Sequence, residues 1–553
     1  MTEESPRRPK IPRANLSCYR SGGVSCTFPT MTMPRGASRR AFRCATFLIG
    51  VTAAAPSAAQ QRARPTGVAY TVDFPDPANH TAVVTARVPT EGRASLELMM
   101  PIWSPGYYKV ENYADRVRDL AASAPSGAML DVTHDARNRW RIATGGVSAV
   151  VVRYRVTATV QFVTADWVGD SLIVLNGAPT FVTIADSVHR PIDVTLDLPP
   201  GWRSATSLDT VPDGKHDHYR AADYDELVDS PIVAGRDLRF RTFTVRGSRH
   251  TIVDGGNMKS WDSDRAARDL ARIVGEDVRF WGRLPYDHYV FLNLFRRGGG
   301  GLEHKNSTML TSNASSESNP AAYLRWLNFV SHEYFHAMNV KRLRPIELGP
   351  FDYEGAPKTP SLWISEGLTT YYGDLMVVRS GLADASEFLN DMSSLIEQLQ
   401  NTPGRLVQTL SQSSLDVWNS ENSAVGMDRA TTVSYYTKGP IVGWLLDAHI
   451  RHVTDNRRSL DDMMRAEYAR YSGAHGFTPE QFRAVASEVA GTDLTAWFHR
   501  ALDTTAELDY DEALSWYGLE LHGGNDPKTR WQLVMRPDAS DSQRAHLASL
   551  VAP

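Results

Sequence analysis

The chain has 553 residues, 42% of them hydrophobic and 22% charged, and a formal net charge of −4. This composition excludes an intrinsically disordered chain, because disorder goes with few hydrophobic residues and a high net charge. No collagen period, heptad array or longer repeat occurs, which excludes fibrous and solenoid folds. A soluble globular protein of two or more domains is therefore expected.

Residues 1–59 are predicted to be an N-terminal extension followed by a signal peptide. The basic stretch Ser38–Arg43 precedes a short apolar run, Ala45–Ala55, and a small-residue cleavage site ends at Ala59. The apolar run is too short to span a bilayer, which needs about 20 residues. The paired arginines in the basic stretch resemble a twin-arginine signal, so we expect a bacterial protein exported to the periplasm or secreted. A disordered basic tail on a cytoplasmic protein is the alternative.

Cleavage after Ala59 would remove all three cysteines, Cys18, Cys26 and Cys44, and with them any disulfide. The remaining chain would carry 50 Lys or Arg and 61 Asp or Glu, a net charge of −11. This acidic balance argues against nucleic acid or anionic lipid as a partner, because both select basic surfaces. We expect no membrane span in the mature chain, and the sequence leaves its oligomeric state open.

Residues 66–246 are predicted to form an N-terminal antiparallel β-domain. Short runs in which apolar and polar residues alternate, such as Val68–Val72 and Ile192–Leu198, are separated by Pro, Gly, Asp and Asn. Alternation at this spacing is typical of antiparallel strands. From Asp262 onwards the pattern becomes helical, with one further strand-like run at Tyr289–Phe295 before a glycine cluster.

Eight segments of the second half have helical spacing, which predicts an α+β fold with a β-rich half before a largely helical one. Two of these helices open with a capping residue and a proline, at Asn319-Pro320 and at Thr359-Pro360. Gly381 is the expected residue after the end of the second of these helices. The segments are 264–283, 320–344, 360–380, 385–401, 437–454, 458–472, 478–490 and 493–503.

The helix that opens at Pro320 contains an H-E-x-x-H motif, from His332 to His336. Two histidines four residues apart lie on one helical face and can bind one metal ion, with Glu333 beside them as a general base. A catalytic zinc needs a third protein ligand and leaves its fourth position for water. Glu366, on the next helix, is the candidate if the two helices pack antiparallel. The alternative is that Glu366 is a first-turn acid favoured by the helix dipole.

Four motif blocks, together with Met100–Tyr108, resemble the glycyl aminopeptidase family, which belongs to the gluzincin zinc peptidases. The resemblance covers about residues 66–520 and implies a thermolysin-like zinc catalytic domain over 247–420, then a mostly helical C-terminal domain over 421–553. Position 338 carries Met where members commonly have Trp, and the chain leaves no room for the PDZ domain that many members carry. The blocks are HEYFHAMNVKRLRP at 332–345, LWISEGLTTYYGD at 362–374, GGGGLEHKNS at 298–307 and YYTKG at 435–439.

The resemblance implies a metal site and a catalytic base. His332, His336 and Glu366 would bind one Zn²⁺ per chain. Glu333 would be the general base for the zinc-activated water and then the proton donor to the leaving amine.

The resemblance also implies contacts to the substrate. Tyr436 would hydrogen-bond the oxyanion of the tetrahedral intermediate, with Tyr435 as the alternative donor. Gly300 and Gly301 would form a strand edge that pairs with the substrate backbone, and Glu303 would hold the free α-ammonium. Alternatively, the glycines permit a tight turn and Glu303 is solvated.

These assignments predict an exported zinc aminopeptidase that removes small N-terminal residues, Gly or Ala, from peptides with a free N-terminus. The residue preference follows from the family alone. A zinc endopeptidase of the same clan is one alternative, and it requires that Glu303 leave an extended chain unobstructed. A catalytically silent, zinc-containing peptide-binding protein is the other, although a purely structural zinc site has no use for Glu333. The basic stretch Lys341–Arg344 is interpreted as the complement of the helix dipole.

Overall fold

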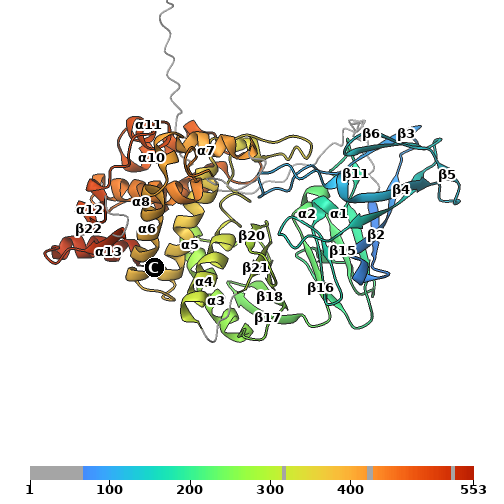
Figure 1. Ribbon diagram of the computed structural model, residues 1–553, viewed down its shortest axis with the longest axis horizontal. Coiled ribbons are helices and arrows are strands. Elements are labelled where there is room, and N and C mark those ends of the chain that lie inside the picture. Colours follow the sequence, from blue (N-terminus) through green and yellow to red (C-terminus); the bar gives the residue numbers. More distant parts are fainter. Residues whose placement is uncertain (1–66, 314–318, 420–427, 525–529, 553) are drawn as a thin grey trace, which may run out of the picture. The chain divides into compact units, whose positions relative to one another are not determined.

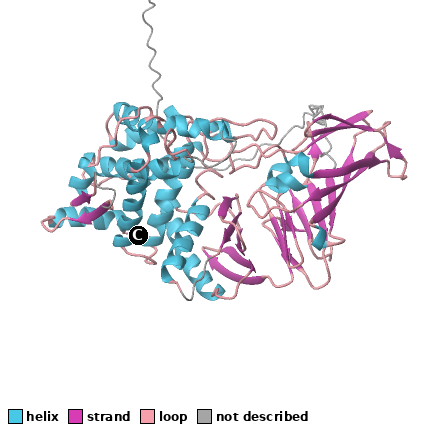
Figure 2. Ribbon diagram, in the orientation of Figure 1, coloured by secondary structure: helices cyan, strands magenta, loops and turns pink. Residues whose placement is uncertain are grey.

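A computed structural model describes residues 67–552 with the exception of 314–318, 420–427 and 525–529. All of the described residues lie in one compact unit, Arg64–Pro553. The predicted extension and signal peptide, residues 1–59, lie outside the described residues. Strands predominate up to Ser312 and helices from Pro320 onwards, so the predicted α+β order is confirmed (Figure 1 and Figure 2).

The largest sheet of the β-rich part has eight strands in the order β14-β15-β12-β1-β2-β8-β4-β5. Alternate residues of these strands are buried, as Val68, Tyr70 and Val72 are in β1, because successive side chains point to opposite faces. The buried side chains share one hydrophobic core with those of two smaller sheets. The strands are β1 (Val68–Asp73), β2 (Thr81–Pro89), β4 (Val117–Ser123), β5 (Met129–Leu130), β8 (Ala149–Thr157), β12 (Ile192–Asp197), β14 (Asp209–Thr210) and β15 (His218–Ala221).

The two smaller sheets have four strands each, in the orders β13-β16-β10-β9 and β11-β3-β7-β6. Most neighbouring strands of the three sheets are antiparallel as predicted, but β1 and β12 run parallel. Buried and exposed side chains alternate with a period of two in parallel and antiparallel strands alike, so the sequence pattern does not show which way neighbouring strands run. The strands are β3 (Ser95–Met99), β6 (Val132–Ala136), β7 (Arg139–Ala143), β9 (Trp167–Val168), β10 (Leu172–Leu175), β11 (Thr183–Ile184), β13 (Arg203–Ala205) and β16 (Ile232–Gly235).

A five-stranded sheet follows, in the order β17-β18-β19-β21-β20. β18, β19 and β21 are parallel neighbours, and β20 pairs antiparallel with β21 at the edge. The sequence pattern predicted β19 but missed β18 and β21. The resemblance to the family, rather than any alternating pattern, implied the strand edge at Gly300 and Gly301 that β20 contains. The predicted boundary between residues 246 and 247 falls in the turn between β17 and β18. The elements are β17 (Arg239–Val245), β18 (Ser248–Gly256), α3 (Ser263–Trp281), β19 (His288–Phe295), β20 (Gly300–Glu303) and β21 (Ser307–Ser312).

The helical part contains α4 to α13 and one hairpin, β22 (Leu519–His522) with β23 (Gln532–Met535). Every segment predicted to be helical contains a helix, whereas α7, α12 and α13 were not predicted. Most buried apolar side chains of this part form one core. The helices are α4 (Pro320–Phe335), α5 (Thr369–Arg379), α6 (Ala385–Gln400), α7 (Leu410–Asp416), α8 (Tyr435–Val453), α9 (Leu460–Tyr471), α10 (Pro479–Ala490), α11 (Thr495–Leu502), α12 (Asp511–Tyr517) and α13 (Asp541–Val551).

Two helices differ from the prediction close to the H-E-x-x-H motif. The helix expected at 320–344 is shorter in the structure, where α4 ends at Phe335. The prediction was too long because Met338 and Leu343, beyond the end of the helix, are also buried and continue the apolar spacing. The helix expected at 360–380 begins with a π-helical segment, η4 (Trp363–Leu368), which passes directly into α5. Its end is as predicted, since Gly381 has a left-handed φ of 70°.

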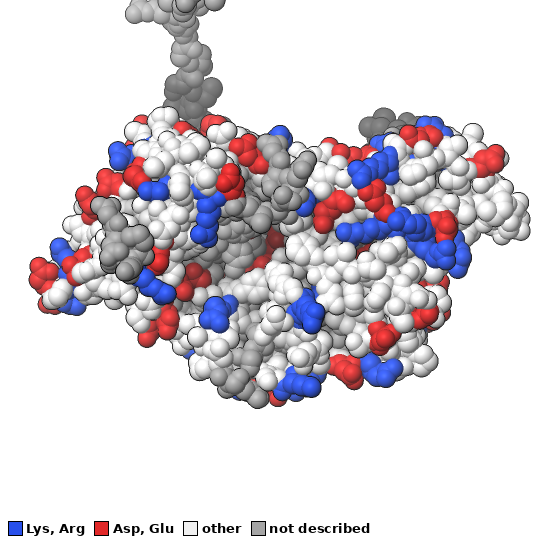
Figure 3. All heavy atoms as spheres, in the orientation of Figure 1, with Lys and Arg blue, Asp and Glu red and all other residues white. Residues whose placement is uncertain are grey.

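The surface of the described residues is mixed in charge. Figure 3 shows acidic and basic side chains interspersed over the face drawn, in keeping with 59 Lys or Arg and 63 Asp or Glu in the whole chain. Within the described ranges, no helix combines the length and the apolar character that a membrane crossing requires.

Candidate active site

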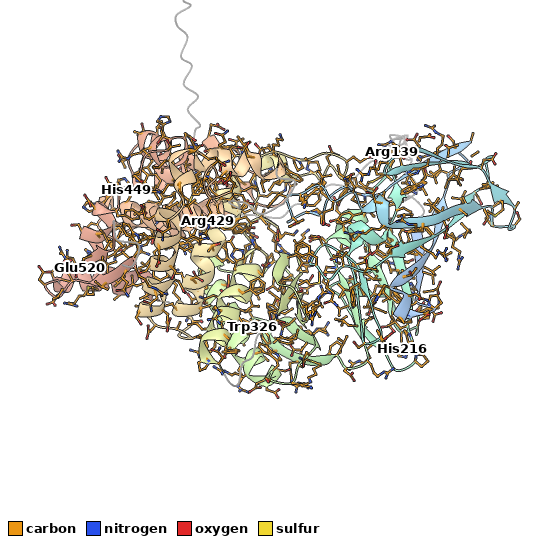
Figure 4. The ribbon with its side chains drawn as sticks, in the orientation of Figure 1. Arg139, His216, Trp326, Arg429, His449 and Glu520 are labelled. Atoms are coloured by element: carbon orange, nitrogen blue, oxygen red, sulfur yellow. The ribbon has the colours of Figure 1, made fainter. Side chains whose placement is uncertain are left out.

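The H-E-x-x-H residues lie at the C-terminal end of α4. Trp326, earlier in this helix and labelled in Figure 4, donates its indole N–H to Asn293 of β19 and so holds α4 against the five-stranded sheet. His336 caps the helix but keeps right-handed helical backbone angles, and its N–H bonds to the carbonyl oxygen of His332. The two imidazoles therefore lie on one face, with their Nε2 atoms 3.1 Å apart.

Glu366 reaches the same point from η4. Its Oε2 lies 3.3 Å from His336 Nε2 and 3.8 Å from His332 Nε2. Around an ion with bonds of about 2.1 Å, tetrahedral ligand atoms lie about 3.4 Å from one another. Burial would raise the pKa of the Glu366 carboxyl, but interactions with the two imidazoles outweigh burial and hold that pKa below its ordinary value. The three residues therefore fit a catalytic zinc site that leaves one position open.

Hydrogen bonds to the outer ring nitrogens assign the tautomers of both histidines. Thr370 donates its hydroxyl to the carbonyl oxygen of Glu366, so at 3.3 Å from His332 Nδ1 it accepts the hydrogen of that nitrogen. His336 Nδ1 lies 2.9 Å from the carbonyl oxygen of Asn339, which can only accept. Both Nδ1 atoms therefore carry the hydrogen. With Nδ1 protonated, loss of the Nε2 proton would leave the lone pair of each Nε2 for a metal ion.

Glycines let the segments that carry these residues approach one another closely. A β-carbon at Gly373 in α5 would lie 3.0 Å from the Cα of His332 in α4. A β-carbon at Gly367 in η4 would lie 2.7 Å from the Cα of Gly439 in α8. Side chains do not fit between backbones at these distances, so the three glycines determine how closely α5 packs against α4 and η4 against α8.

Glu333 lies beside the two histidines and faces β20. Its side chain is 5% exposed, and its Oε2 has no hydrogen-bond partner among the residues that the structure describes. A β-carbon at Gly301 would overlap Glu333 Oε1, so glycine is required at that position of β20. Burial raises the pKa of the Glu333 carboxyl well above its ordinary value, which suits a group that takes up and returns a proton.

Glu303 ends β20 and is 3% exposed, which contradicts the alternative that it is a solvated turn residue. Its Oε1 has no hydrogen-bond partner within the described ranges. Carboxylate oxygens of Glu303 and Glu333 and a ring nitrogen of His336 lie within 4.8 Å of one another. Burial raises the pKa of the Glu303 carboxyl, although the charges of His336 and Lys341 oppose it. A buried acid without a partner is ready to bind a cationic group.

All of the residues predicted for the site line one cavity of about 440 Å³, so the structure brings every one of them together. These are His332, Glu333, His336, Glu366, Gly300, Gly301, Glu303 and Tyr436. The β-rich part contributes an apolar wall, in which the rings of Tyr107 and Phe162 meet edge to face with centroids 5.3 Å apart.

The two candidate oxyanion donors begin α8 but have different surroundings. Tyr436 is 39% exposed and lines the cavity, with its ring centroid 6.4 Å from that of His332. Tyr435 is 1% exposed and packs in the core of the helical part. Of the two, Tyr436 has the side chain that a substrate in the cavity can reach.

Sequence reasoning missed two residues that support the site, Tyr108 and Asn339. The hydroxyl of Tyr108 donates a hydrogen bond to Glu366 Oε1 at 3.3 Å, although the two residues are 258 positions apart in the sequence. The only sequence feature that pointed to Tyr108 was its place in the Met100–Tyr108 block, which resembles the family. Asn339 donates its amide to the carbonyl oxygen of Ile364 in η4 at 2.8 Å. Such contacts depend on tertiary packing, which no local pattern encodes.

Lys341 differs from its interpretation as a helix-dipole complement. The helix has ended before this residue, and the Lys341 side chain is buried with its Nζ 2.7 Å from Asp229 Oδ1. His304 Nδ1 lies 3.3 Å from the same oxygen. Burial would raise the pKa of the Asp229 carboxyl, but the charges of Lys341 and His304 outweigh it and lower that pKa. The stretch after the H-E-x-x-H motif is thus joined to the β-rich part by a buried ion pair.

Comparison with protein families matches two parts of the chain. Residues 69–236 match the Peptidase M61 N-terminal domain, and residues 325–442 match the M61 glycyl aminopeptidase model. The two matches together span just over half of the chain. His332, Glu333, His336, Glu366 and Tyr436 lie within the second match.

Similar solved structures support the same assignment. An aminopeptidase N family protein from Idiomarina loihiensis has 26% sequence identity and a TM-score of 0.78, over 86% of this chain and 82% of that one. The M1 zinc metallopeptidase from Deinococcus radiodurans has 13% identity and a TM-score of 0.50, over 81% and 95%, and shares the fold alone. No curated protein matches the chain. The chain belongs to the M61 glycyl aminopeptidase family and is a metallopeptidase.

Proposed function

We propose that this metallopeptidase holds one zinc ion per chain and removes the N-terminal residue from peptides with a free N-terminus. The observation that carries the proposal is the convergence of His332, His336 and Glu366 on one point, beside two buried acids, Glu333 and Glu303. The donor set and its spacing fit zinc. Each of the two acids has an oxygen without a hydrogen-bond partner among the described residues, and both acids line the same cavity. When bound, zinc would supply Lewis-acid polarisation of the scissile carbonyl and a more acidic water molecule.

Glu333 is proposed as the general base. Its unpartnered Oε2 can accept a proton, and its raised pKa allows the protonated carboxyl to persist until the proton passes to the leaving amine. Tyr436 is proposed as the donor to the oxyanion, because its side chain lines the cavity next to His332. Tyr435 is less suitable because it is buried in the core.

Glu303 is proposed as the anchor of the substrate α-ammonium group. The Oε1 atom of the buried Glu303 carboxylate has no hydrogen-bond partner among the described residues. A cationic group beside it would stabilise the ionised carboxylate through a charge-assisted hydrogen bond. β20 is the edge strand of its sheet, so Gly300 and Gly301 can pair with the backbone of an extended substrate. Together these contacts would place the first peptide bond of the substrate, and no later one, at the zinc site.

The preference for Gly or Ala at the N-terminus is a further part of the proposal and rests on the family. The preference would arise from contact between the N-terminal side chain of the substrate and the apolar wall that Tyr107 and Phe162 form in the cavity.

Rates for one peptide with a free and with an acetylated N-terminus test the proposal. Wild type should cleave the free peptide and leave the acetylated one nearly untouched, because acetylation removes the charge that Glu303 binds. Glu303→Gln, which keeps the size of the side chain, should lower kcat/KM for the free peptide by about 10- to 100-fold and narrow the gap between the two peptides. Equal rates for both peptides with wild type would favour the endopeptidase, and zinc binding without cleavage of either would favour the silent binding protein.

We also propose that the chain is exported by the signal within residues 1–59. The support is the order of basic stretch, apolar run and small residues that ends at Ala59. N-terminal sequencing of protein recovered from the periplasm of a bacterial host should give Gln60 as the first residue. A cytoplasmic protein that retains Met1 or Met31 would contradict export.

A further inference from the structure

We infer that Tyr108, from the β-rich part, is a positioning residue that orients Glu366 for the metal ion; the inference rests on the proposed zinc site. The two oxygens of Glu366 have different neighbours. Oε2 faces the Nε2 atoms of both histidines, whereas Oε1 accepts a hydrogen bond from the Tyr108 hydroxyl at 3.3 Å. The tyrosine thereby leaves one defined oxygen for the metal.

Tyr108 suits this positioning role because its hydroxyl acts as the hydrogen-bond donor to Glu366. Its side chain is 6% exposed, and its hydroxyl is the donor in the bond to Glu366 Oε1. An ionised carboxylate can only accept. A carboxylate tied at one oxygen loses the rotation that would otherwise present either oxygen, or both, to the ion.

The loop that carries Tyr108 is itself held rigidly. Trp103 is buried and donates its indole N–H to the carbonyl oxygen of Asp352 at 2.8 Å, and its ring meets that of Trp418 edge to face. The loop is therefore joined to the segments that carry Asp352 and Trp418. Tyr108 does not have to be ordered when the metal binds.

The same loop contacts the second acid of the cavity. Gly106 has a left-handed φ of 98°, and a β-carbon there would lie 2.6 and 2.8 Å from the two carboxylate oxygens of Glu303. One loop thus donates a hydrogen bond to the metal ligand Glu366 and lies against the proposed amine anchor Glu303. The β-rich part is therefore a component of the active centre, and its loop acts on two separate steps, metal binding and substrate binding.

Zinc affinity of metal-free protein tests the assignment without reference to activity. Tyr108→Phe should bind zinc about 10- to 100-fold more weakly than wild type, measured by competition with a chromogenic chelator, as is usual when the partner of a metal ligand is removed. Tyr113→Phe is the matched control, because its hydroxyl is also buried and bonded in this loop but touches no metal ligand. Its zinc affinity should equal that of wild type. The melting temperatures of both metal-free variants show that they fold.

Cobalt in place of zinc gives a second readout. The visible absorption of the cobalt protein reports ligand geometry, so it should change in Tyr108→Phe and not in Tyr113→Phe. Wild-type zinc affinity and an unchanged cobalt spectrum in folded Tyr108→Phe would overturn the inference while leaving the zinc site intact. If wild type itself binds no zinc, the proposed function fails as well.

Gly106→Ala separates the two contacts of the loop. The added methyl group should displace the Glu303 carboxylate, raising KM for a peptide with a free N-terminus by about tenfold, while zinc affinity stays at the wild-type value. An unchanged KM would contradict the shared role of the loop.

Discussion

The two sides of the catalytic cavity are built in different ways. On the helical side, the candidate metal ligands and Glu333 stand on or directly after α4 and on η4, and glycine contacts pack α4 against α5 and η4 against α8. On the other side, Gly106 and Tyr108 lie on an irregular loop of the β-rich part and reach Glu303 and Glu366 across long stretches of sequence. The first side supplies the groups that react, and the second holds them in place.

This difference predicts that substitutions on the helical side and substitutions in the loop have different effects. Removal of a group on the helical side should abolish either metal binding or a chemical step. A change in the loop should leave the chemistry possible but make it less efficient, because the reacting groups remain and only their placement suffers.

Glu333→Gln should have the largest effect on turnover. The amide has the shape of the carboxylate but cannot accept the proton, so kcat should fall by about 10²- to 10⁴-fold or more, while zinc content stays at the wild-type level. Steady-state rates and metal analysis of the same preparation measure both quantities. A fully active Glu333→Gln enzyme would mean that another group is the base.

Tyr436→Phe should come next. Loss of an oxyanion donor typically costs about 10²- to 10³-fold in kcat with little change in KM. Tyr435→Phe is the matched control at the neighbouring position and should lose less than about tenfold, because its side chain is in the core. The reverse order of the two variants would transfer the role to Tyr435.

Gly439→Ala should have the smallest effect on the site and act mainly through stability. The added β-carbon would lie 2.8 Å from the Cα of Gly367, so η4 and α8 must move apart at a cost of about 1–3 kcal/mol in the free energy of unfolding. Gly275→Ala in α3 is the control, since its β-carbon would meet nothing within 4 Å. It should instead stabilise the protein by about 0.4–1 kcal/mol. Denaturant unfolding of both variants measures the difference.

The sequence predicted those parts of the fold whose side chains repeat with a clear period. The alternation in β1 and the helical spacing in α3 and α6 each reflect one buried face, which a local pattern records. Prediction failed where local and tertiary requirements diverge. Apolar spacing continued beyond Phe335 because Met338 and Leu343 are buried in a non-helical segment. The π-helical segment η4 has carbonyl groups bonded by Asn339, a contact that no periodicity signals.

The candidate site was predicted more completely than the fold around it. His332, Glu333 and His336 form a local motif whose chemistry follows from helix geometry, and Glu366 follows from the need for a third ligand. The resemblance to the family added Glu303 and Tyr436. Tyr108 and Gly106 could not be predicted, because their contribution depends on a loop that meets the cavity only after the β-rich part has folded.

Zinc content tests the central claim most directly. Wild type, purified without added metal and dialysed, should contain about one zinc ion per chain by elemental analysis. His332→Ala and Glu366→Ala, if folded, should contain almost none, because two ligands do not retain the ion against dialysis. Wild-type zinc content in either variant would contradict the proposed metal site and the catalytic account built on it.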